Sequence, residues 1–344
     1  MRNQTHRNRQ EPHLRRVLGV TLALGIILPI TACATQEPQS SNSAEVEQAV
    51  ALAVDASRVQ VIGTGEGEKR VLSYEDLPAD GETAEEQEVT LSVSDGFSQT
   101  VAPAAQANPL APAGGDVSTM RFPLTATVSA AGASETESLS ATRAIRIWSG
   151  QPAFTDVDLA EDIRSGEGFE LGIRANDLGQ QSSVSFAAPV NATDTGRLML
   201  EQYLLKYTSL PIIFPAEPVG TGASWTVDSR VTGESTLLQT VTYTVNALRG
   251  SEVELDVDIS QRPSLGAIDI TGEQAGEQAG NRDAAPAQLT VLNSNTTSTG
   301  SLTVDLSRPV PTGGEVSWTT RIIYGGSDND TRVIQDSTSS LSFS

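Results

Sequence analysis

The sequence predicts a mainly β fold. We expect one large antiparallel sheet, built as a half-barrel or as two β lobes, with one amphipathic helix packed on it. Several segments alternate apolar and polar residues with the period of two that a strand imposes, and residues 253–259 do so most clearly. A single long segment, residues 193–210, instead repeats its apolar residues with the period of a helix.

The segment 253–259 presents two contrasting faces. Apolar side chains occupy one face and carboxylates the other: Val253, Leu255, Val257 and Ile259 against Glu252, Glu254, Asp256 and Asp258. This contrast is typical of a sheet with one buried and one solvated face. Because side chains on one face of a strand lie about 7 Å apart and no glycine turn gathers them, the carboxylates indicate a solvated surface rather than a calcium site.

Turn signals divide much of the remaining chain into further strands. Clusters of Gly, Asp and Asn between apolar runs predict hairpins, and therefore antiparallel pairing. Three hairpins are expected, each given as strand, turn and strand: 58–62, 63–68 and 69–74; 88–93, 94–96 and 97–101; and 169–173, 176–179 and 182–187. Further strands are expected at 119–128, 138–148, 241–245 and 302–306.

Two segments have no periodicity. Residues 103–116 are rich in Ala, Pro and Gly, which is typical of a linker or a long loop. Residues 271–287 contain a repeated Gly-Glu-Gln-Ala and are interpreted as a low-complexity loop. We expect one folded domain over residues 46–344, with its lobe boundary at 103–116 if the sheet is divided in two.

The expected helix begins near Thr193 or Asp194, either of which can cap it, and ends at Leu210 before Pro211. Its broad apolar face predicts that it lies on the sheet. That face consists of Met199, Leu200, Tyr203, Leu204, Tyr207 and Leu210. A second, narrow stripe of Leu198 and Leu205 predicts cover on the other side too, by a loop or by a ligand.

This helix leads to a candidate ligand cavity between helix and sheet. Met199, Tyr203, Leu204 and Tyr207 would line the cavity, with Trp225 nearby. Met and Tyr side chains suit an adaptable apolar wall. The plain alternative is a core helix that closes over a curved sheet without any ligand.

The N-terminus has the pattern of a bacterial export signal. Five arginines lead into an apolar run at 17–30, and Ile30-Thr31-Ala32-Cys33 follows as a lipobox. In such signals the Cys thiol receives a diacylglyceryl group, and cleavage leaves Cys33 as the new N-terminus. We therefore predict a signal peptide at 1–32, a flexible tether at 33–45, and a protein held by lipid on the extracytoplasmic face of the cell membrane.

Other interpretations of this start are an uncleaved anchor and an ordinary signal with an incidental cysteine. A spanning helix needs about 20 apolar residues, more than the run at 17–30 provides. Arg15-Arg16 leaves the twin-arginine export route open beside general secretion.

Composition restricts the chemistry of the mature chain. Removal of residues 1–32 takes away five of the 22 basic and one of the 43 acidic residues, which leaves a net charge of −25. Such a surface repels nucleic acid, so no nucleic-acid partner is expected. Both histidines, His6 and His13, precede Cys33, the single cysteine. Histidine-dependent catalysis and His/Cys metal sites are therefore excluded, and we expect no enzyme, no cofactor and no metal.

Directly after the expected helix, residues 218–225 read Pro-Val-Gly-Thr-Gly-Ala-Ser-Trp and lead into a strand. This P-V-G-x-G-A-x-W turn resembles a motif of a family of actinobacterial secreted lipoproteins that share a lipobox, a β-rich body and one helix. The resemblance is most specific over residues 165–260. It implies the same fold and location, and it brings no activity and no catalytic residue. By looser analogy, many strands with one apolar helix resemble the half-barrel lipoprotein carriers, which hold acyl chains between sheet and helix.

Two functional hypotheses follow. The first is a structural or interaction protein of the cell envelope, anchored through lipid on Cys33, whose partner is an envelope protein or a cell-wall polymer. The alternative is a carrier or binder of a hydrophobic or lipid ligand. The carrier needs a connected apolar cavity, roughly 300–1,000 Å³ for a drug-sized ligand, whereas the interaction protein needs none.

Overall fold

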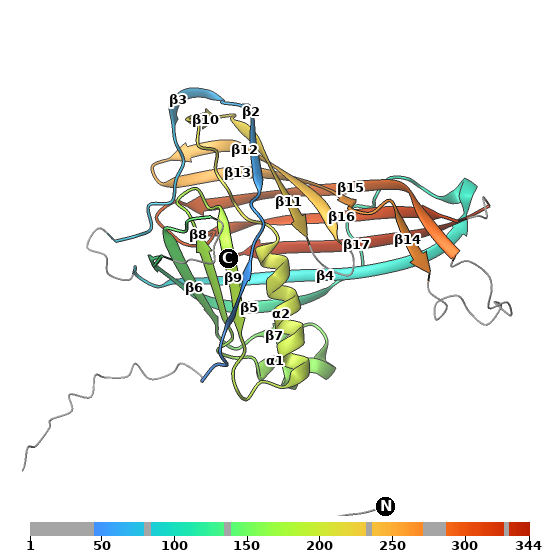
Figure 1. The fold of residues 1–344 in the computed structure, drawn as a ribbon, viewed down its shortest axis with the longest axis horizontal. Coiled ribbons are helices and arrows are strands. Elements are labelled where there is room, and N and C mark those ends of the chain that lie inside the picture. The colour runs from blue at the N-terminus through green and yellow to red at the C-terminus, as the bar shows by residue number, and fades with distance from the viewer. Residues whose placement is uncertain (1–44, 79–83, 134–138, 232–235, 271–286, 327–329) are drawn as a thin grey trace, which may run out of the picture. The chain divides into compact units, whose positions relative to one another are not determined.

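The computed structural model describes residues 45–78, 84–133, 139–231, 236–270, 287–326 and 330–344. They belong to one compact unit, Ser43–Ser344. The predicted fold class is confirmed, because the unit is mainly β and is built on one large antiparallel sheet (Figure 1). The predicted signal peptide, Cys33 and nearly all of the predicted loop 271–287 lie outside the described residues.

The elements have the following bounds. The strands of the main sheet are β1 (Val50–Ala53), β2 (Arg58–Gly63), β4 (Gln87–Pro103), β5 (Ser118–Ala130), β6 (Arg143–Ser149), β7 (Ala153–Phe154), β8 (Glu170–Ala175), β9 (Gln181–Ala187), β11 (Ser224–Val231), β12 (Leu237–Arg249), β13 (Glu252–Pro263), β14 (Ala267–Ile270), β15 (Ala287–Asp305), β16 (Gly313–Gly325) and β17 (Thr331–Phe343). A separate pair consists of β3 (Glu66–Arg70) and β10 (Val219–Thr221). The helices are α1 (Ala160–Arg164) and α2 (Asp194–Thr208), with 3-10 turns at Ala104–Gln106 and Val157–Leu159.

The two edge strands of the main sheet are neighbours in the sequence. Its strand order is β1-β9-β8-β6-β5-β4-β17-β16-β15-β13-β12-β11-β2, with β7 beside β5 and β14 beside β15. β1 and β2 follow each other in sequence yet stand at opposite ends of this order. Between them, the N–H of Val54 still donates to the carbonyl of Ser182 beside β9, at 3.0 Å. The segment 50–63 therefore pairs with both edges of the sheet.

One of the three predicted hairpins is confirmed and two are wrong. Residues 169–173 and 182–187 pair as β8 with β9. The strands β2 and β3 exist, but β2 pairs with β11 and β3 with β10, so they form no hairpin with each other. β3 lies mostly in the predicted turn 63–68, and residues 71–74 of the predicted strand are not in a strand. Local sequence therefore located β2, but it gave neither the bounds of β3 nor the partner of either strand.

The third predicted hairpin, with its turn at 94–96, is a single long strand. β4 continues through these residues and pairs with β17 along its length. A Cβ atom at Gly96 would overlap the carbonyl oxygen of Asp116. The glycine is required by this close backbone approach rather than by a turn, which explains why a turn-like sequence lies within a strand.

Residues 103–116 cross one face of this sheet. The N–H of Ala111 donates to Asn295 Oδ1 and its carbonyl accepts from Thr297 Oγ1, each at 2.8 Å, so both partners lie on β15. The N–H of Gly114 donates to Thr319 Oγ1 on β16, at 3.2 Å. β4 and β5, which precede and follow the segment, pair with each other. The segment therefore links neighbouring strands of one sheet by way of β15 and β16.

Helix α2 lies on the opposite face from residues 103–116. On β17, Ser339 Oγ lies 3.4 Å from Lys206 Nζ of α2. In the preceding residue, Thr338, the hydroxyl oxygen lies 3.0 Å from that of Thr319, which accepts the bond from Gly114. Adjacent residues of a strand point to opposite faces, so the helix and the crossing segment cover different sides.

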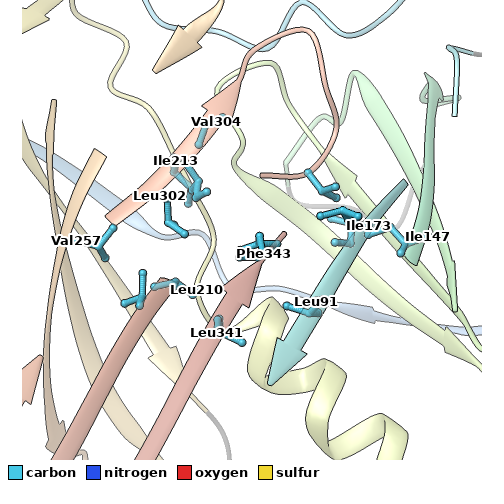
Figure 2. Close-up of a cluster of buried hydrophobic side chains, with 14 of the residues drawn as sticks. Leu91, Ile147, Ile173, Leu210, Ile213, Val257, Leu302, Val304, Leu341 and Phe343 are labelled. Atoms are coloured by element: carbon cyan, nitrogen blue, oxygen red, sulfur yellow. The ribbon is translucent and has the colours of Figure 1, made fainter. Parts of the chain in front are cut away.

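The hydrophobic core lies on the side that α2 covers. Figure 2 shows buried side chains that come from separate parts of the curved sheet: Leu91 of β4, Ile147 of β6, Ile173 of β8, Val257 of β13, Leu302 and Val304 of β15, and Leu341 and Phe343 of β17. Leu210 and Ile213, from the segment after α2, pack among them. The helix and its following segment therefore close one continuous core.

The predicted helix is confirmed with nearly the predicted bounds. Thr193 caps α2, because its side chain accepts a bond from the N–H of Gly196 at 3.0 Å. The short helix α1 was not predicted. It packs against α2 at Gly196, where a Cβ atom would overlap the carbonyl oxygen of Asp162. In the part of the chain that the structure describes, no helix is both long and apolar enough to cross a membrane.

Candidate functional site

The predicted ligand-cavity residues lie on α2 and at the start of β11. Tyr203, Leu204 and Trp225 are buried, while Met199 and Tyr207 are partly buried and pack against the core. The sequence therefore identified side chains that point to the interior. What these side chains contact determines whether they form a cavity.

Tyr203 fixes α2 to β5 and β7. Its hydroxyl donates to the carbonyl of Ser118 at 3.3 Å, and its ring meets Phe154 edge-on with 5.6 Å between centroids. Burial, with a contribution from the Asp95 carboxylate, raises the pKa of Tyr203 to about 12. Because both its ring and its hydroxyl are engaged by protein, this tyrosine anchors the helix.

Trp225 fixes the segment that follows α2. Its Nε1 donates to the carbonyl of Ile213 at 2.8 Å, and its ring centroid lies 6.0 Å from that of Phe214. Next to it, Tyr243 donates its hydroxyl to the carbonyl of Pro211 at 2.9 Å, and burial raises the pKa of Tyr243. Trp225 and Tyr243 thus satisfy backbone carbonyls that would otherwise be buried without a partner.

A cavity of about 50 Å³ lies beside Tyr207, between separate strands of the curved sheet. Ile145 and Ile173 line it from β6 and β8, and Leu302 and Phe343 line it from β15 and β17. Of the five predicted residues, Tyr207 is the one in this lining. The cavity has room for about four water molecules. It is several-fold smaller than the roughly 300–1,000 Å³ of a pocket for a drug-sized ligand.

Arg143, which lines this cavity, belongs to a buried ion pair that the sequence analysis missed. Arg143 Nε donates to Asp76 Oδ1 at 2.8 Å, and Arg143 Nη2 pairs with Asp76 Oδ2. The two side chains are 1% and 0% exposed. The guanidinium carbon lies 4.0 Å from the ring centre of Tyr74, a cation–π contact, and burial raises the pKa of Tyr74 to about 12. The pair neutralises itself within the core and leaves no net charge to attract an ionic ligand.

One half of this pair could have been found from the sequence. Arg143 has the same parity as Ile145 and Ile147, so the alternation of this strand places its side chain on the buried face. Asp76 lies outside regular secondary structure, where no periodicity indicates which way a side chain points.

A chain of buried amides ties the end of α2 to the sheet. Gln239 Nε2 donates to the carbonyl of Ser209, the C-cap residue of α2, at 2.8 Å. Gln261 Nε2 donates to Gln239 Oε1, and Thr320 Oγ1 donates to Gln261 Oε1, each at 2.8 Å. A connected polar network of this kind favours one orientation of the helix on β12, β13 and β16.

Lys206 forms a second polar contact beneath α2. Its Nζ lies 2.8 Å from Asp95 Oδ1, and Ser339 Oγ donates to the same carboxylate oxygen at 3.0 Å. A serine near a lysine raises the question of a nucleophile, but a nucleophile must be reachable by its substrate. Ser339 is 2% exposed, so this cluster docks the helix and does not present a reactive group.

Carboxylates near α1 accept hydrogen bonds from neighbouring protein groups. Asp156 Oδ1 accepts a bond from the N–H of Asp158 at 3.0 Å, and Asp162 Oδ1 accepts one from Thr193 Oγ1 at 2.7 Å. Among the described residues, no group of three or more His, Cys, Asp and Glu side chains is arranged to hold a metal ion.

Comparisons with protein-family models, with curated proteins and with solved structures found no match to this chain. The resemblance of residues 165–260 to actinobacterial secreted lipoproteins, and the analogy to half-barrel carriers, therefore stay predictions.

Proposed function

We propose that this protein is a lipoprotein, anchored on the extracytoplasmic face of the cell membrane, that acts by binding an envelope partner. The lipobox that ends at Cys33 supports the anchor. The choice of a binding role rests on the packing beneath α2. Tyr203 and Trp225 bond to protein backbone, and the cavity beside Tyr207 measures about 50 Å³.

The chemistry of the mature chain supports a role without catalysis or cofactor. It has no histidine, and its single cysteine is the proposed lipidation site. Ser339, whose Oγ lies 3.4 Å from Lys206 Nζ, is buried and bonded to Asp95. A partner would therefore be recognised by the surface of the protein, and the candidates are an envelope protein and a cell-wall polymer.

Carriage of an apolar ligand is the second candidate. The cavity beside Tyr207 favours it, because this cavity lies between helix and sheet and is lined mostly by apolar side chains. To admit an acyl chain, α2 would have to move away from the sheet. That movement would break the contacts of Lys206 with Asp95 and of Gln239 with Ser209, so we rank this function second.

The anchor is tested by Cys33→Ala expressed in the native host, with Ser40→Ala as the control in the same segment. We expect the native protein and the control to sediment with membranes and to carry the mass of a diacylglyceryl group. The Cys33→Ala variant should lose both properties. A variant that stays with the membrane as before would contradict the anchor.

The binding role is tested by crosslinking in intact cells of the native host. The lipidated protein should form a discrete crosslinked species, and mass spectrometry would identify the partner in it. Crosslinking that never exceeds the background of an unrelated lipoprotein would contradict the interaction.

A further inference from the structure

The chain enters the described domain beside the N-terminal end of α2. The N–H of Val190 donates to the carbonyl of Glu45 at 2.8 Å, and the N–H of Glu47 donates to the carbonyl of Ala188 at 2.9 Å. Arg197, in the first turns of α2, forms an ion pair with Glu47 at 2.6 Å. In Figure 1 the blue N-terminal segment accordingly runs beside β9 and α2. The end of the predicted tether is therefore fixed at this place on the surface.

Large apolar side chains are exposed around this entry point. We call them the entry patch, and they are Val50 (69% exposed), Leu52 (50%), Val190 (48%) and Leu198 (56%). Val190 lies in the loop that binds Glu45, and Leu198 follows Arg197. Exposed apolar residues that gather at one place mark a surface for interaction.

The outer side of α2 also carries exposed apolar side chains. The sequence predicts that Leu198 and Leu205 are covered by a loop or by a ligand, yet they are 56% and 43% exposed among the described residues. The two side chains lie on one stripe of the helix, on the side away from the core. The described part of the chain therefore leaves this stripe uncovered.

We propose that the entry patch is a membrane-docking surface, an inference that rests on the proposed lipid anchor. Twelve residues lead from Cys33 to Glu45, and even a fully extended chain of this length spans at most about 40 Å. The lipid therefore keeps the entry patch close to the bilayer at all times. This proximity gives a weak apolar surface a high effective concentration of lipid.

Charge determines which bilayer the entry patch can approach. The mature chain has a net charge of −25, and Arg197 at the entry point is paired with Glu47. Docking therefore depends on apolar side chains that enter the headgroup region, without a basic cluster. Anionic lipid should weaken it, because a negative membrane surface repels a negative domain.

The test uses the full lipidated protein reconstituted on phosphatidylcholine vesicles that contain a nitroxide-labelled lipid. Leu198→Cys supplies a thiol for a fluorophore, since Cys33 is the only native cysteine and its thiol is acylated. Leu110→Cys is the matched control. It is 62% exposed and lies in the segment that crosses the opposite face of the sheet.

We expect nitroxide quenching to be several-fold stronger at position 198 than at position 110. Replacing part of the phosphatidylcholine with phosphatidylglycerol should reduce this difference. Equal quenching at the two positions, with the protein bound to the vesicles, would overturn the docking surface and leave the anchor intact. A protein that fails to float with the vesicles would instead contradict the proposed anchor, and the docking surface with it.

Discussion

The two sides of α2 carry the same residue type and have opposite surroundings. On the inner side Leu200 and Leu204 are 0% and 1% exposed, within a core that continues across the sheet. On the outer side Leu198 and Leu205 are 56% and 43% exposed. Leucines at helical spacing therefore have two different roles in this helix. The inner leucines stabilise the fold, and the outer leucines are available for contact with something outside it.

The polar contacts of α2 follow the same division. Lys206 meets Asp95, and the carbonyl of Ser209 meets Gln239, both on the side of the sheet. These bonds fix the helix in place and do not leave it free as a lid. A function that opens the interior must break them, whereas a function of the outer surface leaves them intact.

The largest expected effect comes from an interior charge. Arg143→Met leaves the Asp76 carboxylate buried without a partner and should lower the free energy of unfolding by about 3–5 kcal/mol. Arg249→Met removes an exposed pair with Glu254, which solvent screens, and should leave the free energy of unfolding nearly unchanged. Urea unfolding followed by tryptophan fluorescence measures both. Equal losses would show that the interior pair is not the buried contact described above.

The leucines of α2 test the comparison most simply. Leu200→Ala should lower the free energy of unfolding by about 2–5 kcal/mol, because it leaves a cavity in the core. Leu198→Ala should change it by less than about 0.5 kcal/mol. The same denaturation experiment applies. A large loss at position 198 would mean that the outer stripe is packed against protein after all.

A smaller effect is expected at the start of α2. Thr193→Ala removes the cap on Gly196 and the bond to Asp162, and it should cost about 0.5–2 kcal/mol. Thr195→Ala, at an exposed position in the same turn, is the control and should be close to neutral. Matching losses for the two variants would refute the capping role.

The tyrosines should make the stability of the protein depend on pH at alkaline pH, and they have no such effect at neutral pH. Burial raises the pKa of all five, to about 12 for Tyr74 and Tyr203, from an ordinary value of 10.0. Above pH 10 the unfolded chain loses protons that the native protein keeps, so stability should fall as the pH rises from 10 towards 12. Below pH 10 these groups are protonated in both states and contribute no pH dependence.

Urea unfolding on either side of pH 10 measures this decline, and Tyr207→Phe is the variant that tests its cause. Tyr207 lies beside Phe343 in the cavity lining, and a phenylalanine there keeps the ring and removes the titrating hydroxyl. The variant should lose less stability than the native protein as the pH rises. An unchanged dependence would assign the decline to other groups.

Local pattern in the sequence predicted elements better than it predicted their partners. The helix bounds followed from Thr193 and Pro211, and the alternation at 253–259 gave the strand β13. The turn-like Ser94-Asp95-Gly96 was misinterpreted, since the need for glycine arises from Asp116, which only the folded chain brings near. Pairing of β2 with β11 likewise depends on distant residues that no local pattern identifies.

The candidate site shows the same limit. Helical periodicity correctly predicted that Tyr203 and Leu204 point inward, but it could not show whether a cavity remains beside them. That depends on side chains from other parts of the sheet, such as Phe154 against Tyr203. The ion pair of Arg143 with Asp76 was not predicted for a related reason, because Asp76 lies in an irregular segment.

The most direct test of the central claim is native mass spectrometry of the protein purified from its own host. We predict the mass of the chain from Cys33 with its covalent lipid and no further bound molecule, since the inner side of α2 is filled by protein and the cavity beside Tyr207 measures about 50 Å³. A stoichiometric apolar molecule that is released by organic extraction would contradict the account. It would show that the interior opens to hold a ligand.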